Sequence, residues 1–408
     1  MGSIITLGIN KMEIDWGKNN VFSNHSSLFQ KGDFEQKIPY YTVDDEDEVI
    51  IQYENGAKKK LKDIKERLDL LGYDLKGIEE KYNEIVDEYE FYTENKMTMS
   101  FENFKKFLIN IDTKKVDNIR SAIEDIEDGY ESGEFFRKCI LGDEEISDNI
   151  FSEFEEGKYI IGEFFESIDP YIILRILAEN ESNLESYVEW RYNEVIENRW
   201  VKKEDIIEEL GEKNKILIAT EGSTDSFILK RTIDILYPNI SDFFNFIDMK
   251  ENYPFTGVGS LKNFCNGLAK INIQNNIIVL FDNDTAGIET FNAIRNIQKP
   301  INLLFCHLPD YREFETFKTI GPFGNQINNI NGKAVSIECF LDLSSVENEP
   351  IVRWKNYNER MQEYQGALEN KDRYTIKFKS ANLLDGSYDC SKLKHLIDYI
   401  IKEWMNRK

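Results

Sequence analysis

Short runs of apolar, β-branched residues alternate with helix-length amphipathic segments after about residue 212, and this alternation constrains the fold more than any other feature of the sequence. The pattern is typical of parallel α/β units, in which a helix connects each strand to the next. It therefore predicts a Rossmann-like parallel sheet with flanking helices in the C-terminal half. The strands are expected at 215–219, 243–247, 277–281 and 301–306, and the helices at 224–236, 261–269, 285–297 and 394–406.

The N-terminal half has a different pattern. Apolar residues alternate with polar ones through much of the segment before Leu61, and the segment 5–16 predicts a strand pair. Asn55-Gly56 is a typical hairpin turn. From 61 to about 201 the apolar spacing becomes helical, with Val188 among the residues of the helical stripes. This half is therefore expected to be a mainly helical α+β domain that contains a β-hairpin, and the boundary between the halves is expected at 200–212.

The overall charge limits how this protein can bind nucleic acid. The chain carries 75 acidic and 50 basic side chains, and its formal net charge is −25. A protein with this charge has no global basic surface that could hold nucleic acid through counterion release. A nucleic-acid substrate would therefore need a local basic strip or a bridging metal ion.

Cysteine spacing and hydropathy indicate the cellular compartment in which the protein is expected. The five cysteines are widely spaced and form no CxxC pair, which argues against zinc and against a disulfide framework. They are expected to be buried thiols in a reducing environment. The N-terminus lacks the regions of a signal peptide, and no run of about 18 apolar residues occurs. We therefore expect a cytoplasmic protein with no membrane association.

Two of the expected strands are followed by acidic motifs, EGSTD at 221–225 and DNDTAG at 282–287. The carboxyl ends of parallel strands lie at one edge of the sheet, so Glu221, Asp282 and Asp284 are expected within a few ångströms of one another. Three carboxylates this close cannot all remain ionised unless a divalent cation neutralises them. The sequence therefore predicts a Mg²⁺ site, which Mn²⁺ can also occupy.

These motifs resemble the Toprim domain shared by topoisomerases, bacterial primases and the overcoming-lysogenization-defect (OLD) nucleases. The family pattern is strand-Glu-Gly, a glycine turn, and strand-Asp-x-Asp. The corresponding segments here are ILIATEGSTD, FTGVGSLKN and IIVLFDNDTAG. The resemblance covers about residues 215–341 and implies metal-dependent chemistry on phosphodiesters.

The resemblance also implies roles for individual side chains. Glu221 and Asp225 would be metal ligands, with Glu221 also a candidate proton-transfer group. Asp282 and Asp284 would hold magnesium. The segment SIECFL looks like the later Ile-Glu segment of the nuclease members, so Glu338 is the candidate ligand of a second metal ion.

Glycines near these motifs are candidates for the close approach of a phosphate backbone, because they carry no side chain. Two of these glycines lie in the acidic motifs, and two lie in the segment that corresponds to the glycine turn of the Toprim pattern. They are Gly222, Gly287, Gly257 and Gly259.

A phosphodiesterase also needs a cation near the cleaved phosphate, to offset charge in the transition state. The most concentrated basic stretch after the acidic motifs is GALENK at 366–371, followed by Lys377 and Lys379. Lys371 is the first candidate for a catalytic cation by its position. A solvated, charged surface is the alternative interpretation.

The segment from Met1 to Asp33 resembles the HEPN/Toprim N-terminal domain, which precedes Toprim domains in bacterial proteins. The similarity extends to about Gly72 and less clearly beyond it. HEPN ribonucleases use Arg-x4–6-His, and none of His25, His307 and His395 has an arginine at that spacing. A separate ribonuclease centre is therefore not expected, and this half is expected to recognise a substrate, a partner or a second copy. For His25, a structural hydrogen-bonding role is favoured over a functional one.

Four segments are expected along the chain. Residues 1–72 form the β-rich HEPN/Toprim N-terminal segment and residues 73–205 a helical bundle. Residues 206–345 form the Toprim catalytic domain, and residues 346–408 a helical extension.

The sequence as a whole favours a Mg²⁺-dependent endonuclease that cleaves or nicks nucleic acid, with DNA preferred and RNA, including transfer RNA, left open. The family association suggests antiphage defence. The chain has no Walker A sequence, so a partner ATPase or another defence protein is expected, and a homodimer stays open. One alternative is a non-catalytic, metal-binding sensor that binds a partner. Another is a phosphohydrolase of haloacid-dehalogenase type, with Asp282 as nucleophile and Asp284 as acid/base.

Overall fold

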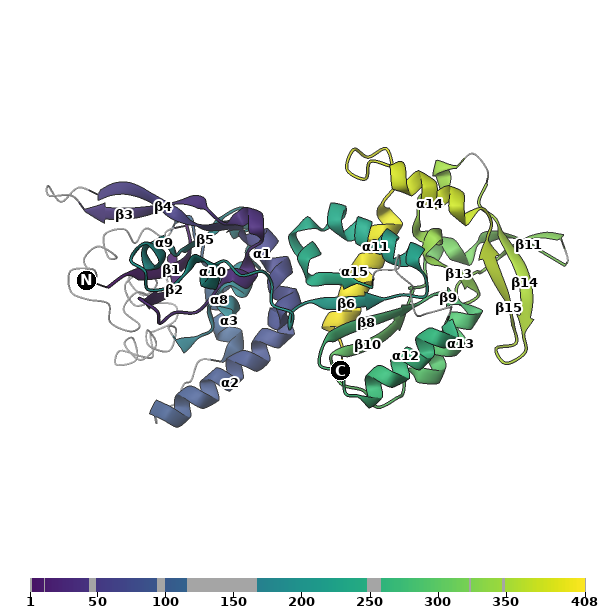
Figure 1. The fold of residues 1–408 in the computed structure, drawn as a ribbon, viewed down its shortest axis with the longest axis horizontal. Helices are drawn as coiled ribbons and strands as arrows, with labels where there is room; N and C mark the ends of the chain where they lie inside the picture. The colour runs from purple at the N-terminus through teal and green to yellow at the C-terminus, as the bar shows by residue number, and fades with distance from the viewer. Residues whose placement is uncertain are drawn as a thin grey trace. The chain divides into compact units, whose positions relative to one another are not determined.

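The chain divides into two compact units, Met1–Gly211 and Glu212–Lys408, in a computed structural model (Figure 1). The break lies within the segment 200–212. Gly257, Cys139 and the acidic run at 44–48 lie outside the described residues. The structure describes residues 2–10, 12–43, 49–93, 100–115, 167–247, 258–322, 324–346 and 349–407.

The described part of the N-terminal unit contains a five-stranded antiparallel sheet in the order β2-β1-β5-β4-β3. The predicted strand pair at 5–16 is confirmed, since β1 and β2 are antiparallel neighbours. The strands are β1 (Ile4–Ile9), β2 (Met12–Lys18), β3 (Gln36–Val43), β4 (Val49–Lys60) and β5 (Tyr187–Arg191).

The central strand of this sheet, β5, corrects the helical prediction for its segment. Trp190 pairs with Leu7 of β1 on one side and with Ala57 of β4 on the other. Val188 and Trp190 are buried while their neighbours in the strand are not, which is the period of two expected for a strand. The N-terminal segment and the helical region are therefore parts of one unit, because β5 completes the sheet begun by β1 to β4.

The predicted hairpin turn at Asn55-Gly56 is also wrong. Gly56 lies within β4, where it pairs with Gln36 and with Arg191. A Cβ atom at Gly56 would lie 2.5 Å from the backbone oxygen of Trp190 and 2.6 Å from Cγ1 of Ile38. Glycine is present here because neighbouring strands approach closely, and not because the chain turns.

Helices cover the N-terminal sheet and complete its core. Ser100 caps α3 by accepting a hydrogen bond from the backbone N–H of Asn103, and Asp169 caps α8 in the same way ahead of a proline. Both caps are local signals, because each cap residue directly precedes its helix in the sequence. The helices are α1 (Leu61–Leu68), α2 (Leu75–Thr93), α3 (Phe101–Ile109), α8 (Pro170–Leu177), α9 (Asn193–Glu197) and α10 (Lys203–Ile206).

The C-terminal unit contains the predicted parallel sheet, in the order β10-β8-β6-β7. Helices α12 and α13 pack on one face, and α11 and α15 lie on the other (Figure 1). The strands are β6 (Ile216–Ala219), β7 (Phe244–Phe246), β8 (Asn276–Phe281) and β10 (Leu303–His307). The helices are α11 (Ser223–Leu236), α12 (Val258–Lys270), α13 (Thr285–Ile294), α14 (Lys371–Ser380) and α15 (Ser391–Met405). None of the described helices combines the length and the apolar character needed to cross a membrane.

A second sheet of the C-terminal unit takes two strands from 346–408, which was expected to be a helical extension, and two from the segment 309–333. This segment contains an antiparallel hairpin, and the described strands of the sheet run in the order β12-β11-β14-β15. Polar residues occupy most of β12, so no apolar alternation marks it in the sequence. The strands are β11 (Phe317–Gly321), β12 (Gly324–Asn328), β14 (Val352–Asn358) and β15 (Glu363–Leu368), and the short β9 (Asn283–Asp284) pairs with β13 (Ala334–Val335).

The environment of Gly56 predicts a specific stability change. Gly56→Ala should lower the free energy of unfolding by roughly 1–3 kcal/mol, because the new methyl group meets backbone that cannot move away. The measurement is urea unfolding of the full chain. Gly32→Ala is the matched control, since a Cβ atom there meets nothing within 4 Å. Equal unfolding midpoints for the two variants would contradict the close approach.

Candidate active site

The site forms where two parallel strands end side by side. Ala219 of β6 pairs with Val279 of β8, so Glu221 and Asp282 leave the sheet at the same edge. The backbone N–H of Asp282 donates to Glu221 Oε1 at 3.1 Å. The chain runs from β6 to β7 on one side and from β8 to β10 on the other, which makes this edge a topological switch point.

Two further carboxylates stand at the beginnings of helices. Asp225 lies in the first turn of α11 and accepts a hydrogen bond of 2.9 Å from the backbone N–H of Gly222. Asp284 caps α13 by accepting from the backbone N–H of Gly287 at 2.8 Å. Backbone donors therefore hold both carboxylates in place.

Glu338 and Lys371 reach the same site from later parts of the chain. Glu338 lies on the single-turn helix Ile337–Phe340, and the hydroxyl of Ser336 donates to its Oε2 at 2.7 Å. Lys371, at the start of α14, forms an ion pair with the same oxygen at 3.2 Å. Of the three candidate lysines, Lys371 faces the carboxylates, whereas Lys377 and Lys379 lie on exposed parts of α14.

The carboxylates hold one another's pKa values high. Burial, and then the negative charge of Glu338, raises the pKa of Asp225 to about 7, and burial raises that of Glu221 to about 7. Burial and the neighbouring acids also raise the pKa of Asp282. Burial would lower the pKa of Lys371, but the charges of Glu338 and Asp282 outweigh it, so the pKa is raised and the lysine stays charged.

This donor set fits a hard divalent cation in its chemistry. Every candidate ligand is a carboxylate, and burial together with the neighbouring acids disfavours the ionised forms, which a bound cation would favour. Asp225 and Asp282 are half-buried as whole residues, and burial is the main effect at their carboxyl groups. Among the described residues, no three acidic, histidine or cysteine side chains lie close enough together to hold a metal ion in the present conformation.

The glycines of the motifs differ in what surrounds them. A Cβ atom at Gly287 would lie 2.2 Å from the backbone oxygen of Asp282, so this glycine permits the tight turn into α13. Gly259 has open space around its Cβ position, and Gly222 lies in ordinary contact with the carboxylate of Asp225. The packing of its own turn is sufficient reason for the glycine at Gly287, and the approach of a phosphate to these glycines stays a prediction.

Sequence reasoning missed Gln365 on β15. Its amide nitrogen donates to Asp284 Oδ2 at 2.5 Å, and its amide oxygen accepts from the backbone N–H of Ala286 at 2.9 Å. The side chain thus binds both the second aspartate and the turn that holds it. Gln365 follows Asp284 by 81 residues and lies in no motif, so only the pairing of the sheets shows its position.

Comparison with known families assigns the N-terminal part of the chain. Residues 1–214 match the family model described as HEPN/Toprim N-terminal domain 1. The chain belongs to this family. The match covers the whole N-terminal unit and extends well past Gly72, where the sequence resemblance became unclear. No curated protein and no solved structure gave a significant match.

Membership of the HEPN/Toprim N-terminal domain family suggests a nuclease-like protein from a defence-related family. The matched residues end just before β6, so the Toprim resemblance of the C-terminal unit stays a prediction.

His25 lies within the matched residues, and its Nε2 is hydrogen-bonded to Asp15 Oδ2 at 2.8 Å. It is buried against the rings of Tyr171 and Trp190. These contacts favour the structural role for His25.

The raised pKa values predict how stability changes with pH in the absence of metal. For Glu221 and Asp225 the folded-state pKa lies above the unfolded value, so their stabilising effect is present at about pH 4 and is lost as the pH rises through 7. The thermal midpoint measured in chelator should therefore fall between pH 4 and 8. Glu221→Gln with Asp225→Asn should flatten this fall, while the exposed Glu359→Gln should not. Parallel curves for all three proteins would contradict the electrostatic picture.

Proposed function

We propose that the C-terminal unit is a Mg²⁺-dependent phosphodiesterase that cleaves or nicks nucleic acid. The observation that carries the proposal is the electrostatic interaction among five carboxylates and one lysine at the switch point of a parallel sheet. DNA is the favoured substrate. RNA, including transfer RNA, stays open, because phosphate recognition does not select the sugar.

The carboxylates are the proposed metal ligands. When bound, Mg²⁺ would supply a Lewis acid that polarises the phosphoryl group and stabilises the leaving oxygen. Mn²⁺ would substitute, since it also takes oxygen ligands. Zinc is not proposed, because the described cysteines are buried as separate thiols. The ligands would be Glu221, Asp225, Asp282, Asp284 and Glu338.

The chain's own residues would divide the remaining work. Glu221 lies beside Asp282 at the ends of the paired strands, and it would accept the proton of the attacking water. Lys371 keeps its positive charge and would neutralise charge on the phosphate oxygens. Gln365 would hold Asp284 in position through its 2.5 Å hydrogen bond.

The proposal also covers the biological role of the protein and the partner of its N-terminal unit. Family membership supports a role in antiphage defence, in which the N-terminal unit would recognise a partner protein, an ATPase among the candidates, or a second copy of the chain. The net charge of −25 argues against a broad basic surface, and it supports binding of nucleic acid through local contacts together with a bridging metal ion.

Cleavage and Mg²⁺ binding test this function together. The full chain should cut supercoiled plasmid, linear DNA or total RNA with Mg²⁺ and not with chelator. Asp282→Ala with Asp284→Ala should abolish both cleavage and Mg²⁺ binding in calorimetry. Lys371→Ala should lower kcat by roughly 10²–10³-fold, as removal of a transition-state donor does, while Lys377→Ala, on the same helix, leaves it unchanged.

Two results would contradict the proposal. Full metal-dependent cleavage by the double aspartate variant would show that the activity arises elsewhere. Mg²⁺ binding by the wild-type chain without turnover of any polymer would support the non-catalytic sensor instead.

A further inference from the structure

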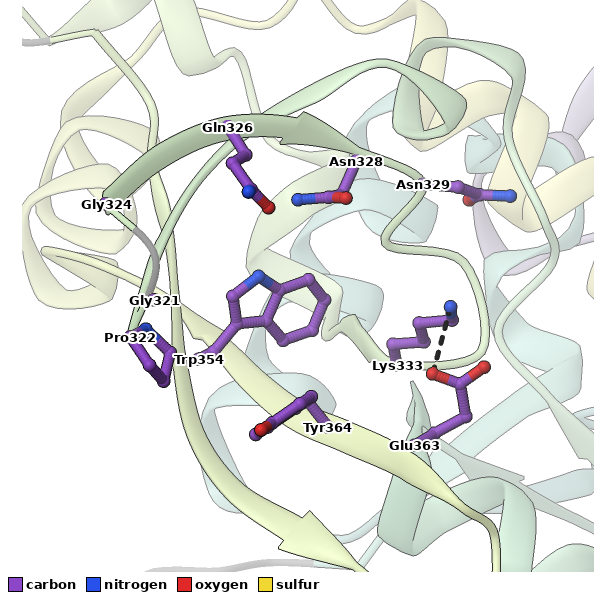
Figure 2. A pocket seen from close by; sticks show the side chains of 10 residues that line it. All are labelled: Gly321, Pro322, Gly324, Gln326, Asn328, Asn329, Lys333, Trp354, Glu363 and Tyr364. Atoms are coloured by element: carbon purple, nitrogen blue, oxygen red, sulfur yellow. Dashed lines mark ion pairs between the residues drawn. The ribbon is translucent and has the colours of Figure 1, made fainter.

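A pocket of about 280 Å³ opens on the second sheet of the C-terminal unit (Figure 2). The amides of Gln326 and Asn328 line one side, and the rings of Trp354 and Tyr364 line the other. This volume lies at the lower end of the roughly 300–1,000 Å³ of typical ligand sites, so it suits a single small ring system. The lining combines aromatic faces with neutral hydrogen-bonding groups.

The pairing of the strands places these side chains on one face of the sheet. Gln326 and Asn328 are two residues apart on β12, so they point to the same side. Gln326 pairs with Thr319 of β11, and Thr319 pairs with Val352 of β14, two residues before Trp354. The register of the strands therefore positions the amides and the aromatic rings, and Pro322, Asn329 and Lys333 from the connecting segments complete the lining.

Glycines on both sides make room for the indole of Trp354. A Cβ atom at Gly321 on β11 would lie 2.8 Å from Trp354 Cδ1, and one at Gly366 on β15 would lie 2.9 Å from Cε3. Trp354 and Gly366 are direct partners in the sheet. The ring of Tyr364 lies next to the indole, with 6.5 Å between centroids. Trp354 is thus held as a partly exposed platform.

Polar groups at the pocket connect it to the carboxylate site. Lys333 lines the pocket and forms an ion pair with Glu363 at 3.0 Å. The backbone of Lys333 bridges to Asp284, and the carbonyl of Tyr364 accepts from the hydroxyl of Thr285 at 3.1 Å. The residue after Tyr364 is Gln365, which binds Asp284. The pocket and the acidic site therefore share two short stretches of backbone.

We propose that this pocket binds an unpaired nucleobase of the substrate strand. The base would stack on Trp354 beside Tyr364, and the amides of Gln326 and Asn328 would contact its edge. Stacking on aromatic side chains and hydrogen bonding to amides are the general means by which proteins hold single-stranded bases. The inference rests on the proposed function, because the shared backbone at Asp284 is what makes a base next to the cleaved phosphate the expected occupant.

The pocket also predicts which form of nucleic acid the enzyme prefers. A base inside a duplex cannot reach a recessed platform unless it is unpaired or flipped out. The enzyme should therefore prefer single-stranded nucleic acid, loops or locally opened duplex. Adenine is the expected best base, since its edge matches the donor and acceptor of an amide side chain.

Binding measured in chelator tests the pocket separately from catalysis. Labelled 12-mers of single-stranded DNA and RNA, in adenine and pyrimidine versions, and a duplex of the same length are titrated with the full chain. Trp354→Ala should weaken single-strand binding roughly tenfold, as loss of one stacking platform does, and Trp354→Phe should restore most of it. Gln326→Ala with Asn328→Ala should remove the preference for adenine.

Matched controls separate the pocket from folding and from general charge. Ile327→Ala changes an exposed side chain between the two amides, and it should bind as the wild type does. Gln326 is exposed, so its variant does not depend on a repacked core. Gly321→Ala should displace the indole and weaken binding without removing the ring.

The outcomes for the two proposals differ. The base-binding proposal is overturned if Trp354→Ala binds single strands as the wild type does, or if duplex binds as tightly as single strands. This holds even if cleavage is intact. Trp354-dependent binding by a chain that cleaves nothing supports the pocket while the proposed function fails. Asp282→Ala with Asp284→Ala should bind single strands in chelator as the wild type does, and a loss equal to that of Trp354→Ala would also overturn a separate base site.

Discussion

The pairing of β6 with β8 is the constraint on which the candidate site depends. It places the residues after both strands at one sheet edge, and the hydrogen bond from the Asp282 backbone to Glu221 joins them directly. Each side chain would be an ordinary acidic residue in water. Together at a switch point, with burial and like charges around them, they carry raised pKa values. The chemistry proposed for the unit therefore follows from strand order.

The second sheet of the C-terminal unit, β12-β11-β14-β15, contacts the carboxylate site and also forms the adjoining pocket. Its strand β15 contacts β13, which pairs with the Asp-x-Asp turn as β9, and Gln365 of β15 binds Asp284 and the start of α13. The same strands present Trp354 and its neighbours on an adjoining face. Geometry at the acidic turn and the shape of the pocket are thus coupled, because both depend on the register of β14 and β15.

The N-terminal unit uses tertiary pairing in the same way. Its sheet is incomplete until β5, which lies far beyond β4 in the chain, enters between β1 and β4. Trp190 on that strand packs against Phe29, Tyr192 and His25. This dependence on a distant strand explains why the family match spans residues 1–214 and does not stop near Gly72.

The sequence by itself determined the parallel sheet, the helix caps at Ser100 and Asp169, and the positions of Glu221 and Asp282 at strand ends, because these follow from local periodicity and from residues next to one another. It predicted Lys371 by position, and the ion pair with Glu338 now places it with the acids. Only the tertiary structure decided that Gly56 lies in a strand, that β5 completes a sheet, and that Gln365 and Trp354 adjoin the acidic site. Those features depend on strand pairing between distant segments, which leaves no local signal in the chain.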